Sequence, residues 1–338
     1  MSEIRTVCIC GGGGLGLVCA GVFLSKGLKV KLLTGHPENW NKDIVVFDPE
    51  GKTYGGKLDI VTSNAAEVIP KADMIFLTLP GFLIEKVLEE IKPFIGEDTV
   101  IGSVVSSTGF FFAAHNILTN QNPLFGFQRV PYIARQRKYG SIGDLLGYKS
   151  CLNVAIENCS NPMELVSNLQ WIFDTKINLL DNFYEASLTN SNPILHTGRL
   201  YSMWKDYDGE VYPERTLFYS DWTDEASEYL INMDEEFQVL LKKLALKEGV
   251  IPTLLQYYES KDAQSLTQKI RSIPAFKTIQ SPMLEKEDGW VPDFKSRYFT
   301  EDFPYGLRFI RDLAKKNGIQ TPTIDKVYRW GQSVIEQD

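Results

Sequence analysis

Short apolar runs alternate with segments of helical periodicity through the first part of the chain. Strands and helices that alternate in this way are typical of a parallel sheet with helices on both faces. We therefore predict an α/β fold built on a doubly wound parallel sheet. The predicted elements are strands at 6–10, 29–34, 72–80 and 99–105 and helices at 14–26 and 81–95.

Two stretches of this first part depart from the alternation. Residues 43–63, "DIVVFDPEGKTYGGKLDIVTS", have two β-rich arms around an Asp-Pro-Glu-Gly turn, which predicts an inserted hairpin. From about residue 123 to 180 the pattern is mixed, with strands expected in "KSCLNVAI" and "KINLL" around a helix at 161–173.

After residue 181 the pattern becomes that of long helices. A domain boundary near 181 follows, with a first domain at 1–181 and an all-helical second domain at 182–338. The segment 273–300 has no clear period and is expected to run as a loop back toward the first domain. Helices are predicted at 182–204, 222–247, 253–271, 303–317 and 322–336, and "NGIQTP" separates the last two.

Composition narrows the class of protein. The chain has 338 residues, a formal net charge of -8 and scattered lysines and arginines, so a nucleic-acid partner is not expected. The five cysteines lack metal-ligand spacing and are predicted to be buried, reduced thiols. The uncharged run 6–24 is rich in glycine and lacks a cleavage site, so neither a signal peptide nor a membrane span is expected. A soluble, cytoplasmic protein is the prediction.

A glycine-rich turn joins the first strand to the first helix. In "CICGGGGLGLVCAG", Gly11 permits a tight turn, Gly13 allows the backbone to approach a pyrophosphate, and Gly16 allows close packing of the helix on the strand. The helix N-terminus then offers free N–H groups to phosphate. The pattern and its context predict a Rossmann-type dinucleotide site, and a purely structural turn is the alternative.

The sequence leaves the choice between NAD and NADP open. An NAD site usually has an acidic residue at the end of the second strand, and here that place reads "LLTGHPENW". No arginine stands there to bind a 2′-phosphate. Thr34 in this segment, and Leu79 and Pro80 in "FLTLPGF", are the other candidate cofactor contacts, whereas His36 is interpreted as a surface residue of the turn.

Candidate chemistry outside the glycine turn centres on one histidine. His196 lies in "TNSNPILHTGRL", where the helical domain begins, whereas His115 lies on a predicted helix and is expected to be structural. Reduction of a carbonyl or imine by hydride also needs a proton, and histidine is its natural donor near neutral pH. On the residues alone, a satisfied structural histidine is the simpler interpretation of His196.

The segment "SRYFTEDFPYGL" offers a partner for this imidazole. Pro304 should start a helix with Asp302 as its cap. The same carboxylate is a candidate to orient His196, and the two roles can coexist. Arg297 has the planar fork that suits a substrate carboxylate, and a surface ion pair is the alternative.

Several of these motifs resemble the octopine/nopaline (opine) dehydrogenase family over nearly the whole chain. "NSNPILH" is similar to the family segment that ends in the catalytic histidine, and "RYFTEDFPYGL" to the one that supplies the aspartate and arginine; "FLTLPGF" and "FGFQRVPYIAR" also fit. The resemblance implies catalytic roles for His196 and Asp302 and substrate binding by Arg297. It also implies a pocket lined by Gln128 and Ser107.

The resemblance implies an activity as well. It is the NAD(P)H-dependent condensation of an α-keto acid, such as pyruvate, with the amino group of an amino acid through an imine, and it leaves a homodimer open. Two departures stand out: Thr197 follows the histidine where proline is frequent, and Gln128 stands where octopine-specific members have an acid, which argues against a cationic amino donor.

Two rival functions are kept. A ketopantoate-type or 2-hydroxy-acid reductase shares this domain layout, but such enzymes tend to use a lysine base, and no lysine lies beside "NSNP". A non-catalytic dinucleotide-binding protein is the second rival.

Overall fold

The computed structural model describes residues 4–119 and 121–336, and the chain forms two compact units that divide between Thr189 and Asn190. The division lies eight residues after the boundary predicted near 181. Helix α6 (Phe183–Leu188) packs against β11 and β8 and therefore stays with the first unit.

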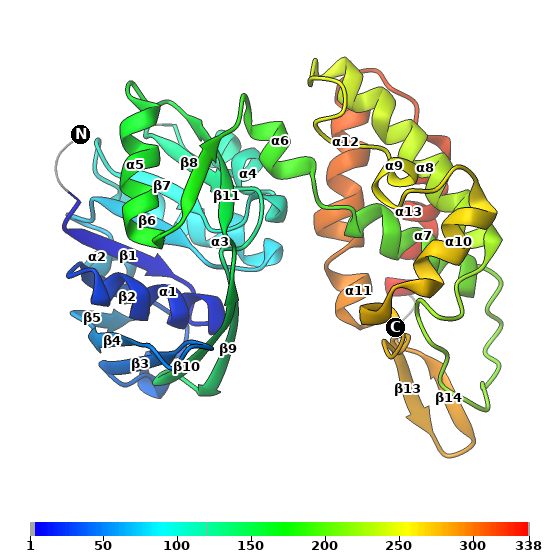
Figure 1. Ribbon diagram of the computed structural model, residues 1–338, viewed down its shortest axis with the longest axis horizontal. Coiled ribbons are helices and arrows are strands. Elements are labelled where there is room, and N and C mark those ends of the chain that lie inside the picture. The colour runs from blue at the N-terminus through cyan, green and yellow to red at the C-terminus, as the bar shows by residue number, and fades with distance from the viewer. Residues whose placement is uncertain (1–3, 120, 337–338) are drawn as a thin grey trace. The chain divides into compact units, whose positions relative to one another are not determined.

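An eight-stranded sheet forms the centre of the first unit (Figure 1). Its neighbouring strands are parallel, except that β11 runs antiparallel to β8. The predicted α/β class with a doubly wound sheet is confirmed. In spatial order the strands are β12 (Lys176–Leu179), β11 (Cys151–Glu157), β8 (Leu124–Phe127), β7 (Val100–Ser103), β6 (Met74–Leu77), β1 (Thr6–Cys10), β2 (Lys29–Leu33) and β5 (Ile60–Thr62).

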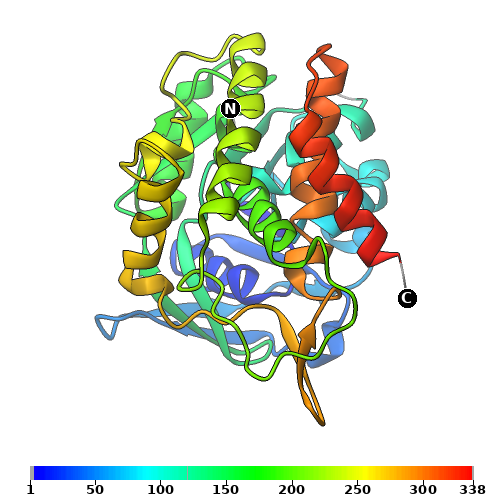
Figure 2. The ribbon, with the colours of Figure 1, turned by 90° about the vertical axis from the view of Figure 1, so that its right-hand side faces the viewer.

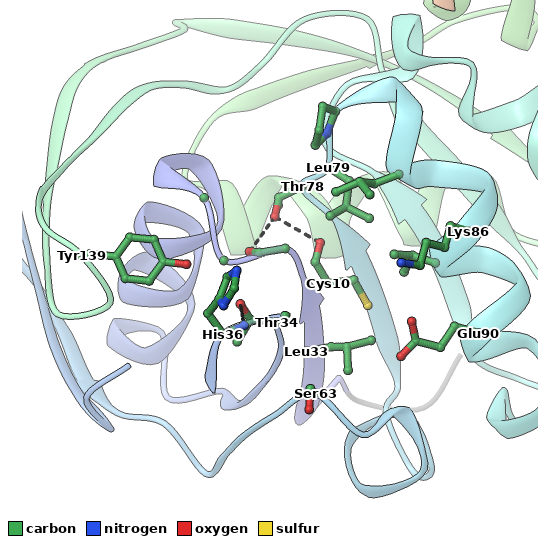
Figure 3. A pocket seen from close by; sticks show the side chains of 17 residues that line it. Cys10, Leu33, Thr34, His36, Ser63, Thr78, Leu79, Lys86, Glu90 and Tyr139 are labelled. Carbon is green, nitrogen blue, oxygen red and sulfur yellow. Dashed lines mark hydrogen bonds between the residues drawn. The ribbon is translucent and has the colours of Figure 1, made fainter. Parts of the chain in front are cut away.

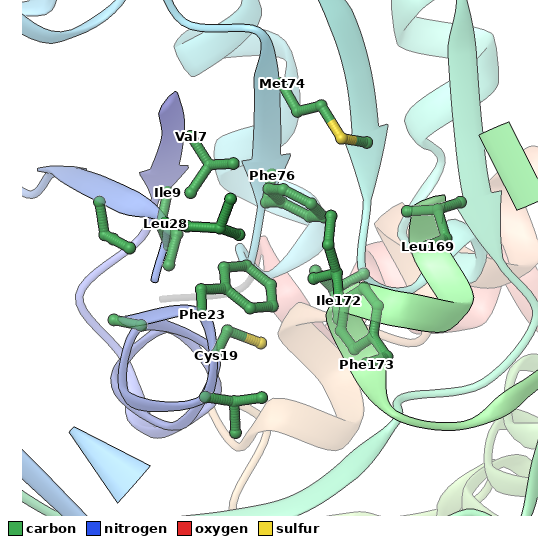
Figure 4. Close-up of a cluster of buried hydrophobic side chains, with 14 of the residues drawn as sticks. Val7, Ile9, Cys19, Phe23, Leu28, Met74, Phe76, Leu169, Ile172 and Phe173 are labelled. Carbon is green, nitrogen blue, oxygen red and sulfur yellow. The ribbon is translucent and has the colours of Figure 1, made fainter. Parts of the chain in front are cut away.

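The helices of the first unit cover both faces of this sheet. Successive side chains of a strand point to opposite faces, so Val7 and Ile9 enter one buried cluster with α1 and α5, drawn in Figure 4, whereas Cys8 and Cys10 enter another with α2, α3 and α4. These helices are α1 (Gly14–Ser25), α2 (Ala65–Val68), α3 (Gly81–Ile91), α4 (Phe110–Ile117) and α5 (Pro162–Phe173), with short 3₁₀ turns at Pro37–Asn39, Lys92–Phe94 and Ser106–Thr108.

A second, four-stranded sheet is added to the first unit. The predicted insertion forms β3 (Asp43–Phe47) and β4 (Thr53–Lys57), which pair antiparallel. The hairpin of β9 (Tyr132–Lys138) and β10 (Ile142–Tyr148) extends this sheet, with β10 parallel to β3. The sequence did not indicate β9 and β10, because polar residues interrupt their apolar positions.

The second unit is mostly helical. Helix α7 packs along α8, and α13 packs against both (Figure 2). The helices are α7 (Asn192–Trp204), α8 (Asp224–Lys243), α9 (Leu254–Tyr257), α10 (Ala263–Ser272), α11 (Arg297–Thr300), α12 (Arg308–Lys316) and α13 (Pro322–Ile335), with a 3₁₀ turn at Pro274–Phe276 and a π-helical turn at Phe303–Leu307.

Three predictions for this unit need correction. The helix predicted at 253–271 is two helices, because Asp262 caps α10 through the backbone N–H of Ser265. The helix predicted at 182–204 is likewise broken between α6 and α7. The segment 273–300 is not a plain loop and the unit is not purely helical, since β13 (Met283–Lys286) and β14 (Gly289–Pro292) form a hairpin.

The structure also bears on the expectations for the cysteines, for a membrane span and for a metal site. Cys8, Cys10 and Cys19 are buried free thiols, but Cys151 is exposed, so the prediction that all five are buried is wrong. Within 4–119 and 121–336, no helix is both long and apolar enough to cross a membrane. The same residues contain no cluster of histidine, cysteine or acidic side chains suited to a metal ion.

One buried carboxylate in α8 makes the second unit sensitive to pH. Asp234 is only 6% exposed, and burial raises its pKa to about 6 although it accepts a hydrogen bond of 2.8 Å from the Leu254 backbone. The unfolded group has an ordinary pKa of 3.8. The folded state therefore holds more protons between about pH 4 and 6, and the free energy of unfolding falls as pH rises through this window.

We expect Asp234→Asn to stabilise the protein at pH 8, because the amide keeps an acceptor oxygen and carries no buried charge. A shift of this size corresponds to about 1–3 kcal/mol. Thermal unfolding at pH 8 and pH 4 tests this: the variant should have the higher Tm at pH 8 and no advantage at pH 4. Glu228→Gln, on the exposed side of the same helix, is the control. An equal gain at both pH values would contradict the assignment.

Candidate active site

The glycine turn between β1 and α1 is shaped by two close backbone contacts. Gly11 has φ +127°, a value that favours glycine. A Cβ on Gly16 would lie 2.0 Å from the carbonyl oxygen of Gly11, so only glycine fits where the helix meets the turn. The Thr78 hydroxyl donates to the same carbonyl at 3.1 Å. These contacts give Gly11 and Gly16 the structural roles that the motif predicts.

A cavity of about 560 Å³ opens above this turn (Figure 3). Five of the six predicted cofactor residues line it: Gly11, Gly13, Thr34, Leu79 and Pro80. Gly16 is the exception, because it lies at the packing contact with Gly11. No atom of the described chain lies within 4 Å of a Cβ built on Gly13, so a phosphate has room to approach the N-terminus of α1 there. The cavity therefore fits a dinucleotide.

The added four-stranded sheet completes this cavity, which the sequence did not reveal. Gln136 of β9 donates its side-chain amide to the Gly12 carbonyl at 2.9 Å. Tyr139, in the turn after β9, lines the cavity, and its ring packs edge to face on Trp40 at 6.3 Å. No local motif marks these residues, because their role depends on pairing with strands some ninety residues earlier.

Charge at the cavity is mixed. Lys86 and Glu90 of α3 and His36 line it, and Figure 3 shows their side chains. The end of β2 carries no acid, and Glu38 lies outside the cavity lining in an exposed contact with His36 at 3.4 Å. The Cys10 thiol on the floor is protonated, because its hydrogen bond with Cys8 and its burial raise its pKa. The lining favours neither NAD nor NADP.

In the second unit, the structure brings His196 and Asp302 together. The Nδ1 atom of His196 on α7 lies 2.8 Å from Oδ2 of Asp302, across 106 residues of sequence. Asp302 precedes the π-helical turn but makes no side-chain capping bond there. The side-chain cap expected of Asp302 is therefore not formed, and the carboxylate instead contacts the imidazole. We call this pair the dyad.

Aromatic side chains enclose the dyad. The hydroxyl of Tyr219 lies 3.0 Å from the other ring nitrogen, Nε2, of His196. The rings of Phe218 and Tyr298 contact the imidazole edge to face at 5.7 and 4.8 Å. The His196 side chain is 12% exposed and that of Asp302 is 20% exposed. Sequence reasoning missed Tyr219, since nothing local distinguishes it from a core tyrosine.

A buried arginine holds the segment that carries Tyr219. Arg199, one turn after His196 on α7, donates to the carbonyl oxygens of Phe218 and Asp221 at 3.0 and 2.8 Å. Burial lowers its pKa to about 10, and its guanidinium lies 5.4 Å from the Trp222 ring. Arg199 thus ties the 218–222 segment to the helix that presents His196.

The predicted substrate residues lie in different settings. Arg297 makes a bidentate ion pair with Glu301 at 2.8 Å for both bonds, and its side chain is 81% exposed. Gln128 donates to the Glu185 carbonyl and the Thr189 hydroxyl and accepts from Asn153, so it fastens the end of α6 to the sheet. Ser107 is half-buried in the 3₁₀ turn after β7. Substrate contacts by these residues stay predictions.

Known proteins match both units. The family described as NAD/NADP octopine/nopaline dehydrogenase, alpha-helical domain, matches residues 179–335. Opine dehydrogenase of Haliotis discus hannai is 29% identical to this chain and aligns over all of it and over 92% of the relative. These matches show that the chain is similar to the octopine/nopaline (opine) dehydrogenase family over its whole length.

Other relatives show the same similarity. Tauropine dehydrogenase of Arabella iricolor is 26% identical over 98% of this chain and 91% of its own length. A solved octopine dehydrogenase with NADH and L-arginine superposes with a TM-score of 0.86 at 25% identity, covering 98% of this chain and 89% of that one. The ketopantoate reductase family model matches residues 7–109, which lie in the first unit. The helical part, which holds the dyad, matches opine dehydrogenases.

Proposed function

We propose that this protein is an NAD(P)H-dependent opine dehydrogenase, which condenses an α-keto acid with the amino group of an amino acid and reduces the resulting imine. The observation that carries the proposal is the His196–Asp302 pair in a unit that matches the opine dehydrogenase helical domain. The glycine cavity of the first unit supports it, because relatives of this kind bind NADH.

The proton steps of this reaction suit the dyad. Nε2 of the imidazole exchanges its hydrogen bond with the Tyr219 hydroxyl for one with the ammonium group of the amino acid and takes a proton from it, and the free amine then attacks the keto carbon. The carbinolamine hydroxyl receives that proton and leaves as water, which gives an iminium ion. Asp302 stabilises the charged imidazole while it holds the proton.

The bound nicotinamide supplies the hydride that reduces the iminium carbon. Gly11, Gly13, Thr34, Leu79 and Pro80 hold the cofactor in this proposal. The product amine then takes one proton from solvent, so keto acid, amino acid, NAD(P)H and one proton give the secondary amine, NAD(P)⁺ and water.

The carboxylate of the keto acid is assigned to Arg297. Glu301 uses the Nε and Nη2 groups of this guanidinium, so Nη1 is the group that meets the substrate. The side chain of the amino donor is neutral in this proposal, because Gln128 replaces an acid and its amide already bonds to Asn153 and Thr189. A cytoplasmic location and a homodimeric state remain further predictions.

A matrix of amino acids against keto acids, read by the absorbance of NADH and NADPH, tests the proposal. Turnover is expected only when both an amine and a keto acid are present, and neutral amino acids should exceed arginine and lysine by at least about tenfold in kcat/KM. Oxidation of the cofactor by a keto acid alone would instead identify a carbonyl reductase. Cofactor binding without turnover across the whole matrix would identify a dinucleotide-binding protein.

A further inference from the structure

Both ring nitrogens of His196 have partners in the structure. Nδ1 lies against the Asp302 carboxylate at 2.8 Å, and Nε2 lies against the Tyr219 hydroxyl at 3.0 Å. A carboxylate only accepts hydrogen bonds, so the proton of a neutral imidazole lies on Nδ1 and Nε2 presents a lone pair. The Tyr219 hydroxyl is then the donor to Nε2.

The surroundings of Tyr219 fix this donor in place. Its ring is 4% exposed and is stacked between Phe276, at 4.1 Å and 18°, and Trp222, at 6.0 Å and 5°. Burial is the largest of the effects that raise the pKa of Tyr219, so the hydroxyl keeps its proton over the working range of the enzyme. The Arg199 bonds to Phe218 and Asp221 hold the backbone on both sides of it.

We propose that Tyr219 is the positioning residue of the acid/base unit: its hydroxyl donates to Nε2 of His196 and holds the ring in the orientation in which the Nδ1–H group meets Asp302. Tyr219 is buried, whereas the side chains of His196 and Asp302 are partly exposed, so a substrate can reach the dyad but not the tyrosine. Tyr219 therefore acts on the substrate through the imidazole. The effect on turnover rests on the proposed function, but the tautomer does not.

The test compares the wild type with Tyr219→Phe. Tyr258→Phe is the matched control, because Tyr258 is also a buried tyrosine of the second unit, 5% exposed, whose pKa burial raises to about 12. The histidines are labelled with ¹⁵N, and long-range ¹H–¹⁵N spectra report the tautomer of each. The chain has only three histidines, so the signals can be assigned with His36→Gln and His115→Gln.

We expect all three proteins to show His196 as the Nδ1–H tautomer, because each keeps the Asp302 carboxylate. In Tyr219→Phe alone, the Nε2 resonance should move to higher frequency, because its lone pair loses the hydroxyl donor. In the steady state, Tyr219→Phe should lower kcat by about 10- to 100-fold, the range for a lost positioning contact, with the NAD(P)H dissociation constant unchanged within threefold. Tyr258→Phe should keep the wild-type kcat.

Three results would overturn the proposal. They are an Nε2–H tautomer in the wild-type protein, a Tyr219→Phe protein that keeps both the Nε2 resonance and kcat of the wild type, and an equal loss of kcat in Tyr258→Phe. The wild-type spectrum tests the tautomer even where Tyr219→Phe does not fold. If no amine and keto acid give turnover, the proposed function fails, while the spectra still decide the role of Tyr219.

Discussion

Replacing His196 by alanine is expected to lower kcat by about 10²–10⁴-fold, the usual range for loss of a general acid–base group. The imidazole contacts both Asp302 and Tyr219 and is the group that exchanges a proton with the substrate in the proposed mechanism, so its removal breaks the link between the carboxylate and the substrate. Cofactor affinity should not change, because the residues that line the glycine cavity all belong to the first unit.

Steady-state assays with the best substrate pair measure kcat. A fluorescence titration with NADH or NADPH measures cofactor affinity separately. His115→Ala is the control, because it breaks another histidine–carboxylate contact, to Glu157 at 2.6 Å, in the first unit. His196→Ala with wild-type turnover would remove this residue from the mechanism. A loss of cofactor binding in His196→Ala would show that the imidazole serves the cofactor instead.

Gly13→Ala should abolish most cofactor binding while the protein stays folded. The backbone of Gly13 is extended, at φ -79° and ψ 180°, and a Cβ there meets no atom of the described chain within 4 Å. The methyl group would therefore project into the space that a pyrophosphate needs. We expect the dissociation constant of NAD(P)H to rise at least about tenfold, which is about 1.4 kcal/mol, with Tm unchanged within about 2 °C.

Two further alanine variants serve as controls for Gly13→Ala. Gly16→Ala should lower Tm strongly, since its Cβ would lie 2.0 Å from the Gly11 carbonyl. Gly147→Ala adds a methyl group to β10, where the nearest neighbour of the new carbon is the Ile133 side chain at 3.5 Å, and should change neither quantity. Unchanged cofactor affinity in Gly13→Ala would place the cofactor outside the glycine cavity.

Strong local patterns predicted the part of the fold that lies around the cofactor. The strand at 6–10 and the helix that follows it needed only an apolar run and a glycine turn, and the structure has β1 and α1 within one residue of the predicted bounds. The hairpin at 43–63 was likewise visible in its turn residues. The strands β9 and β10 were not, because their stability comes from pairing with β3 rather than from their own composition.

The residues of the candidate site also differ in how far the sequence could predict them. The sequence offered both His196 and Asp302, but only the folded chain shows that the aspartate contacts the imidazole and forms no side-chain cap. Tyr219 could not have been chosen, since fifteen tyrosines share its chemistry and its position beside Nε2 results from the packing of α7 and the 218–222 segment. Sequence propensity predicts single helices and strands. The contacts among Tyr219, His196 and Asp302 form only when segments far apart in the sequence pack together.

The bond from Gln136 to the Gly12 carbonyl joins residues 124 positions apart. Contacts of such sequence separation form late, because the intervening chain must first lose much of its conformational freedom. During synthesis, the glycine turn therefore leaves the ribosome long before the strand that secures it, and the nascent chain passes through a stage with a complete nucleotide motif but an unfinished nucleotide site.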